Sequence, residues 1–121
     1  MDCSVTKSEM LNEMPNKDCI CELAELLKTL GHSSRLMIVE ALGKKSYCVC
    51  DLTAMIGADT STVSKHLSLL KAAGIVRREK QGTHVYYSLT CPCVIDAVAQ
   101  LKPLIKEKLQ HYSHMIEVSN P

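Results

Sequence analysis

The stretch that decides the fold runs from Asp51 to Gly74 and reads DLTAMIGADTSTVSKHLSLLKAAG. Its first part predicts a short helix through Ile56 that ends at Gly57, because glycine readily adopts the backbone conformation that closes a helix. Its second part predicts a longer helix whose inward-facing apolar residues recur at helical spacing: Val63, Leu67 and Leu70. Two helices joined by so short a turn are typical of a helix-turn-helix.

The outward face of the second helix carries side chains suited to nucleic acid. It holds hydroxyl groups, one lysine and one histidine: Ser61, Thr62, Ser64, Lys65 and His66. A purely structural helix more usually exposes glutamate and lysine four residues apart. Hydroxyl and amine donors instead match base edges and phosphates of DNA. We therefore predict that this helix reads double-stranded DNA.

A β-hairpin is predicted directly after this helix. Residues 75–80 and 84–89 are rich in strand-forming types and flank a turn that contains Gly82. Side chains suited to DNA lie toward its tip: Arg77, Lys80, Thr83 and His84. A hairpin that follows a recognition helix is the layout of a winged helix, whose wing reaches the adjacent backbone or minor groove. The prediction is a mainly α fold with a small β-hairpin wing.

The distribution of charge agrees with a DNA-binding middle segment. The whole chain has a formal net charge of only +1. Residues 59–90 carry five basic and two acidic residues, which gives a net +3, whereas residues 1–58 carry six basic and eight acidic residues. A positive middle third is the footprint that phosphates require. A solvated protein surface explains three excess charges almost as well.

Two helices are predicted upstream of this module. Residues 1–17 show no sustained hydrophobic period, and we expect a flexible arm there. A helix capped by Asp18 follows and stops at Gly31, and the next begins at Ser33 or Ser34.

The last predicted helix spans about residues 91–116. Pro103 should kink or divide it, because proline removes one backbone hydrogen bond. Its apolar residues form a narrow stripe suited to another helix: Val94, Val98, Leu101, Ile105, Leu109 and Tyr112. The chain has no Phe and no Trp, so its core is aliphatic, and small helical domains often complete their burial by dimerising. We expect residues 18–121 to form one DNA-binding and dimerisation domain.

Seven cysteines accompany a chain that shows no sign of export. No apolar run approaches the roughly 18 to 20 residues of a membrane span, and the amino terminus lacks the zones of a signal peptide. We therefore expect a cytoplasmic protein without membrane contact. In a reducing cytosol, cysteines are metal ligands or reactive thiols in preference to disulfides. Six of the seven form three C-x-C pairs: Cys19 and Cys21, Cys48 and Cys50, Cys91 and Cys93.

The pair Cys48 and Cys50 precedes the helix that supports the recognition helix, so a ligand bound there could tilt the reading surface. Two thiolates do not complete a metal site. The third ligand must come from elsewhere, from Cys3, Cys19, Cys21, Cys91 or Cys93. Soft sulfur ligands favour thiophilic ions: arsenite or antimonite in trigonal coordination, or Cd(II), Pb(II) and Zn(II). A zinc ion that only staples the fold is an alternative, which an adequate helical core makes unnecessary.

The order of five segments carries a resemblance to one family: residues 27–36, Cys48-Val49-Cys50-Asp51-Leu52, residues 61–67, residues 74–76 and residues 82–89. Over about residues 19–115 the chain resembles the ArsR/SmtB family of winged-helix metal-sensing repressors. The resemblance implies a homodimer through the first and last helices that binds operator DNA as the apo form and releases it when an ion binds. In members with this C-V-C motif, the thiolates bind arsenite or antimonite, or Cd(II) and Pb(II) when an amino-terminal arm adds cysteines, where Cys3 lies.

Two other functions compete with ion sensing. One keeps the fold and makes the cysteines sensors of oxidant or persulfide, as in some relatives, with a crosslink between thiols such as Cys50 and Cys93. The other is a thiol enzyme. Against an enzyme, the chain has no C-x-x-C motif and no Gly-rich nucleotide loop, and we expect no organic cofactor.

Overall fold

The structure is a computed structural model that describes residues 16–119, with side chains for residues 16–112. The predicted arm, with Cys3, lies outside the described residues except for its last two positions. Lys17 begins the first described helix, α2 (Lys17–Leu30), and the side chain of Asn16 just before it accepts a hydrogen bond from the backbone N–H of Cys19 at 3.0 Å. Asn16 therefore caps the helix, and the prediction of Asp18 as the cap is wrong. Asp18 lies in the first turn, where a negative charge favours the helix dipole.

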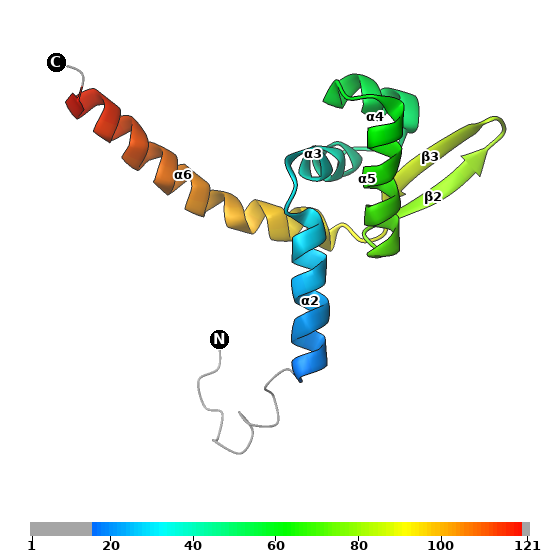
Figure 1. Cartoon of the computed structure of the whole chain (residues 1–121), viewed down its shortest axis with the longest axis horizontal. Helices are drawn as coiled ribbons and strands as arrows, with labels where there is room; N and C mark the ends of the chain where they lie inside the picture. The colour runs from blue at the N-terminus through cyan, green and yellow to red at the C-terminus, as the bar shows by residue number, and fades with distance from the viewer. Residues whose placement is uncertain (1–15, 120–121) are drawn as a thin grey trace.

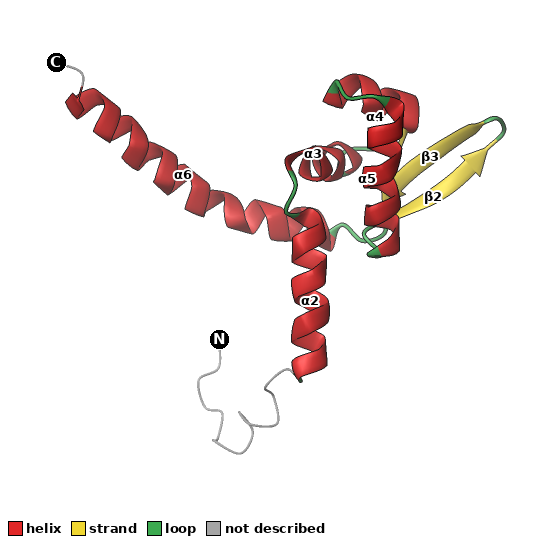
Figure 2. Cartoon of the chain, in the orientation of Figure 1, coloured by secondary structure: helices red, strands yellow, loops and turns green. Residues whose placement is uncertain are grey.

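The remaining described elements confirm the predicted winged helix-turn-helix. They are α3 (Ser33–Leu42), β1 (Tyr47–Cys48), α4 (Val49–Ile56), α5 (Thr60–Ala72), β2 (Val76–Gln81), β3 (His84–Leu89) and α6 (Cys93–Ser119). Figure 2 shows α3, α4 and α5 grouped beside one hairpin that projects from them. We call residues 33–89 the head. From the head, α2 and α6 extend in different directions (Figure 1).

The sheet contains one strand that the sequence did not predict. Its order is β1-β3-β2, with both pairs antiparallel. The strand β1 has only two residues, too few to show an alternating pattern, and it pairs Cys48 with Tyr86 of β3. The wing is therefore tied at its base to the segment that carries the first C-x-C thiol.

The turn between α4 and α5 forms as predicted. Gly57 ends α4 with a positive φ of 75°, and its N–H donates to the carbonyl of Thr53. Thr60 then begins α5, because the Asp59 side chain accepts from the backbone N–H of Thr62 at 2.7 Å. The two helices are thus set by a glycine stop and an aspartate cap.

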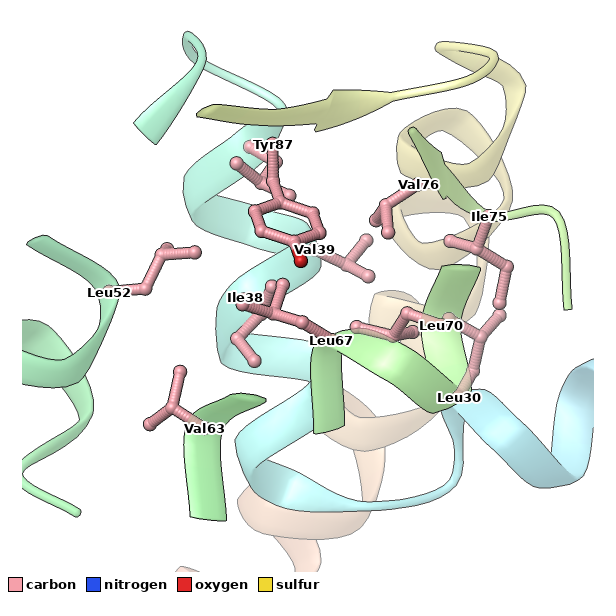
Figure 3. Close-up of a cluster of buried hydrophobic side chains, with 11 residues drawn as sticks. Leu30, Ile38, Val39, Leu52, Val63, Leu67, Leu70, Ile75, Val76 and Tyr87 are labelled. Atoms are coloured by element: carbon pink, nitrogen blue, oxygen red, sulfur yellow. The ribbon is translucent and has the colours of Figure 1, made fainter. Parts of the chain in front are cut away.

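Most of the core lies inside the head, where α3, α4 and α5 meet the sheet, and Leu30 at the end of α2 joins it. The predicted inward residues of α5 are completely buried: Val63, Leu67 and Leu70. Figure 3 shows the Tyr87 ring pointing from β3 toward Ile38 and Val39 of α3. Each aliphatic side chain buried in this way contributes about 1.5–3 kcal/mol. This aliphatic core positions the recognition helix and the wing.

The last helix begins at Cys93 and ends at Ser119, later at both ends than predicted. It starts there because Pro92 lacks the N–H of an interior helical residue and is accommodated just before the first turn. Pro103 lies inside the helix without dividing it, and Figure 1 shows a bend in the helix axis, so of the two predicted outcomes the division does not occur. The carbonyl left without its usual partner belongs to Ala99, an exposed residue that water can reach. Among residues 16–119, no helix is long and apolar enough to cross a membrane.

Candidate DNA interface and thiol site

The first turn of α5 presents the predicted DNA-contacting side chains. Ser61, Thr62 and Lys65 are exposed, and Ser64 is half-buried. Hydrogen bonds from Thr62 to the Asp59 carboxylate hold this turn in place and lower the pKa of Asp59 below its usual value. The turn is therefore fixed before DNA arrives, and the Ser61 hydroxyl and the Lys65 amine remain exposed.

His66, predicted to contact DNA, lies partly buried against the start of α3. Its ring centroid is 4.5 Å from that of His32, and its Nδ1 is 3.4 Å from a guanidinium nitrogen of Arg35. Burial lowers the pKa of His66, and the charges of His32 and Arg35 lower it further. The Arg35 guanidinium also donates to the carbonyl of Thr29. His66 thus connects the recognition helix to the corner between α2 and α3.

The two faces of β2 have different surroundings. Val76 is buried in the core, so Arg78 and Lys80, at alternate positions, lie on the same side of the strand. Arg77 lies on the other side, and its Nε donates to the Ser88 hydroxyl at 3.2 Å. The other wing residues predicted to bind DNA are exposed at the tip: Lys80, Thr83 and His84.

Two basic residues that sequence reasoning omitted lie between α5 and the wing. Lys71 of α5 and Arg78 of β2 line one cleft together with Ser64 and Ser68. The alternation that puts Arg78 on the same side as Val76 was readable in the sequence. That this side faces Lys71 follows only from the packing of β2 against α5.

The first thiol pair sits at the junction of β1 and α4. Cys48 is the last residue of β1 and the N-cap residue of α4, and its thiol donates to the Asp51 carboxylate at 3.2 Å. Cys50 lies in the first turn of α4 and is exposed, whereas Cys48 is half-buried. Within the described residues, no group of three or more Cys, His, Asp or Glu side chains is placed to hold a metal ion.

The other described cysteines lie elsewhere. Cys19 and Cys21 are exposed in the first turns of α2, at the end of that helix remote from α4 (Figure 1). Cys91 and Cys93 are exposed at the start of α6, where the Cys91 sulfur accepts from the backbone N–H of Cys93 at 3.3 Å. The thiol of Cys93 and this N–H lower the pKa of Cys91, and the same contact with Cys91 raises the pKa of Cys93.

This arrangement matches known proteins in both sequence and fold. The family model of bacterial regulatory proteins of the arsR family matches residues 32–78. A transcriptional repressor SmtB homolog from Synechocystis is 32% identical over 95 residues, which are 78% of this chain and 72% of that protein. The chain belongs to the arsR family. It is a DNA-binding transcriptional repressor of the ArsR/SmtB kind, and since its relatives are regulators it is not an enzyme.

Two further proteins resemble the chain. A cadmium resistance transcriptional regulatory protein CadC homolog from Staphylococcus aureus is 41% identical over 69 residues, which are 56% of this chain and 57% of that protein. A homodimeric winged helix-turn-helix DNA-binding domain from Mycobacterium bovis superposes with a TM-score of 0.68 at 23% identity, covering 91% of this chain and 95% of that one. The second comparison shows a shared fold.

Proposed function

We propose that the chain is a homodimeric repressor that binds operator DNA without an ion and releases it when a thiophilic ion binds Cys48 and Cys50. The observation that carries this proposal is the place of the pair between the wing and the helix that supports the recognition helix. Cys48 pairs with Tyr86 of the wing, and α4, which begins directly after it, packs against α5. An ion that draws the two sulfurs together changes the wing and the recognition helix at once.

The third thiolate, in this proposal, comes from the arm or from the partner subunit. No three donors cluster among the described residues of one chain, and Cys19 and Cys21 lie at the far end of α2. Cys3 of the arm, or Cys19, Cys21, Cys91 or Cys93 of a second copy, then completes the site. An all-sulfur site with three ligands favours arsenite or antimonite, and a fourth sulfur favours Cd(II), Pb(II) or Zn(II).

The partner subunit would cover the apolar faces of α2 and α6. Leu23 and Leu27 of α2 and Leu104, Ile105 and Leu109 of α6 are each more than half exposed. A groove of about 340 Å³ runs between them, with Leu27 and Leu30 on one wall and Leu101 and Ile105 on the other. A second copy brings helices with the same narrow stripe, which a two-fold interface requires.

Operator binding would use the exposed first turn of α5 for bases and the wing for the backbone. Ser61, Thr62 and Ser64 then set sequence preference, and Lys65 contacts phosphate. Arg77, Lys80, Thr83 and His84 contribute from the wing. Because a repressor acts where the DNA is, this function places the protein in the cytoplasm.

The deciding experiment measures ion binding and DNA release on the same reduced protein. Arsenite, antimonite and Cd(II) are titrated while thiolate-to-metal absorption and the fluorescence anisotropy of an operator duplex are recorded. Cys48→Ser and Cys50→Ser should each abolish the ion-induced absorption and the ion-induced fall in anisotropy. The proposal fails if none of the ions weakens DNA binding of the fully reduced wild type.

Paired variants identify the third ligand. Cys3→Ser, the Cys19/Cys21 double Ser variant and the Cys91/Cys93 double Ser variant are titrated in the same way. The variant that loses the absorption identifies the cysteine group that supplies the third thiolate. If the ligand comes from the partner, mixing that variant with an equal amount of the Cys48/Cys50 double Ser chain restores about a quarter of the wild-type signal, because half of the dimers are mixed and each mixed dimer holds one complete site of two. No restoration assigns the ligand to the same chain.

A redox or persulfide sensor of the same fold is the second candidate. The contact that favours it is the hydrogen bond that holds the exposed Cys91 sulfur against the Cys93 N–H at 3.3 Å. Treatment with a persulfide donor or hydrogen peroxide, followed by mass spectrometry, distinguishes the two. A specific crosslink between Cys91 or Cys93 and Cys50, together with loss of DNA binding, supports the sensor of oxidant or persulfide.

A further inference from the structure

A polar cleft lies between the recognition helix and the wing. It has a volume of about 380 Å³ and is lined by residues from α4, α5, β2 and β3: Val49, Ser64, Ser68, Lys71, Arg78, Val85 and Tyr87. We call it the wing cleft. Figure 1 shows α5 standing beside the hairpin, and the two elements are in contact.

One wall of the wing cleft is a polar face of α5. Ser64, Ser68 and Lys71 are spaced by four and then three residues, so they lie one above another on the helix. The opposite wall includes Arg78, which shares its side of β2 with the buried Val76. Two hydroxyl groups and two cations therefore converge on one space.

The two cations have no acidic partner in the described part of the chain. The salt bridge found among these residues joins Lys102 to Glu40, far from the cleft in sequence. Glu79, next to Arg78, points to the other side of β2 because strand residues alternate. Two unneutralised cations facing each other repel, so the cleft is suited to an anion that bridges them. A phosphate group fits, since a guanidinium binds two of its oxygens and a lysine a third.

We propose that the wing cleft holds one phosphate of the operator backbone between Lys71 and Arg78. The DNA backbone is the source that the location favours, because the cleft opens between the two elements that a winged helix applies to DNA. Such a contact fixes the register of α5 in the groove without reading sequence. Lys71 and Arg78 are then positioning residues in addition to those at the helix start and the wing tip.

Val49 connects this cleft to the thiol pair. It lines the cleft while its two neighbours in sequence are Cys48 and Cys50. Ion binding by those two sulfurs changes the backbone on both sides of Val49 and so reshapes the cleft. This step rests on the proposed function, whereas the phosphate contact rests only on DNA binding.

The phosphate contact is tested by salt dependence. Lys71→Gln and Arg78→Gln should each weaken binding to an operator duplex and to an unrelated duplex alike, by about tenfold at moderate salt. Each should also lower the slope of log affinity against log salt, by up to about 0.9 for each subunit whose cleft holds a phosphate. The control Lys106→Gln removes the same charge from α6, away from the head, and should leave the slope unchanged.

The source of the phosphate is tested with inorganic phosphate in the absence of DNA. If the cleft serves a free anion instead, phosphate raises the melting temperature of the wild type but not of Arg78→Gln, and the DNA salt slopes of both variants equal that of the wild type. That result overturns the proposal, and so do unchanged slopes without any phosphate effect.

The coupling is tested with Val49→Ala, titrated with arsenite and with Cd(II). The ion-induced absorption should persist, while the ratio of DNA affinities without and with ion falls at least severalfold compared with the wild type. An unchanged ratio refutes the coupling. If neither ion binds even the wild type, the proposed ion-sensing function fails, while the salt slopes of Lys71→Gln and Arg78→Gln still decide the phosphate contact.

Discussion

The head and the two long helices bury their apolar side chains to very different degrees. In the head, Leu52, Val63 and Leu67 have no exposed surface at all. In α6, Leu104 is 66% exposed and Leu109 59% exposed. Exposed apolar area of this extent marks a surface made for a partner. The core of the head is therefore complete within one chain, with Leu30 of α2 at its edge. In the proposed dimer the exposed faces of α2 and α6 are the surface that the second chain covers, so DNA binding and dimerisation would use separate regions.

The largest expected effect comes from the core of the head. Leu67→Ala should lower the free energy of unfolding by about 2–5 kcal/mol, because it leaves a cavity among completely buried neighbours. Denaturant unfolding followed by circular dichroism at one protein concentration measures the change. Met55→Ala, at an exposed position of α4 in the same head, should change stability by no more than about 0.5 kcal/mol. Equal losses in the two variants would contradict the burial of Leu67 in the core of the head.

The second prediction concerns the long helices. Ile105→Glu should raise the dimer dissociation constant by about 100-fold or more, since it puts a charge into the apolar stripe of α6. Sedimentation equilibrium measures that constant, and circular dichroism should show the helices of the head still formed. Gln110→Glu introduces the same charge on a different side of α6 and is the control. A wild-type chain that remains monomeric at high concentration would refute the proposed role of α2 and α6 in dimerisation.

The sequence could predict those features that rest on local signals and not those that rest on long-range contacts. The helix-turn-helix and the wing were predictable because each rests on local signals: the stop at Gly57, the apolar spacing of Val63, Leu67 and Leu70, and the turn at Gly82. The cap of α2 was missed because Asn16 and Asp18 are both good capping residues and only the geometry selects one. The two-residue β1 was missed because its pairing with β3 is a long-range contact.

The candidate site was predictable in composition but not in arrangement. The C-x-C pair and the hydroxyl-rich face of α5 could be read directly from the sequence. That His66 turns toward His32 and Arg35, and that Arg78 faces Lys71, follows from how separate elements pack. No periodicity within one element contains that information. The proposed third ligand is of the same kind, because no three donors cluster among the described residues of one chain.

The third prediction compares two glycines that end helices, one in the head and one in α2. Gly57 has a φ of 75°, and a Cβ added there would meet nothing within 4 Å. Gly57→Ala should therefore cost about 1 kcal/mol through backbone strain alone. Gly31 has a negative φ of −77°, so Gly31→Ala should cost clearly less. Thermal unfolding of both variants provides the measurement, and equal shifts would show that the left-handed turn is not what holds α4 against α5.

The smallest effect is a pH dependence at the cap of α5. Hydrogen bonds from Thr62 lower the pKa of Asp59 below 3.8, so its ionised form stabilises the folded head. For a carboxylate with a lowered pKa, this contribution is present above the unfolded pKa and is lost as pH falls through the lower folded value. Asp59→Asn keeps a capping oxygen but removes the charge. Its melting temperature should lie slightly below that of the wild type at pH 6, and the gap should close as pH falls below about 3.8.

Asp18→Asn removes a carboxylate from the first turn of α2, where Asn16 already caps the helix, and serves as the control. A gap for Asp59→Asn that stays constant from pH 6 to pH 3 would show that hydrogen bonding alone, without charge, fixes the start of the recognition helix.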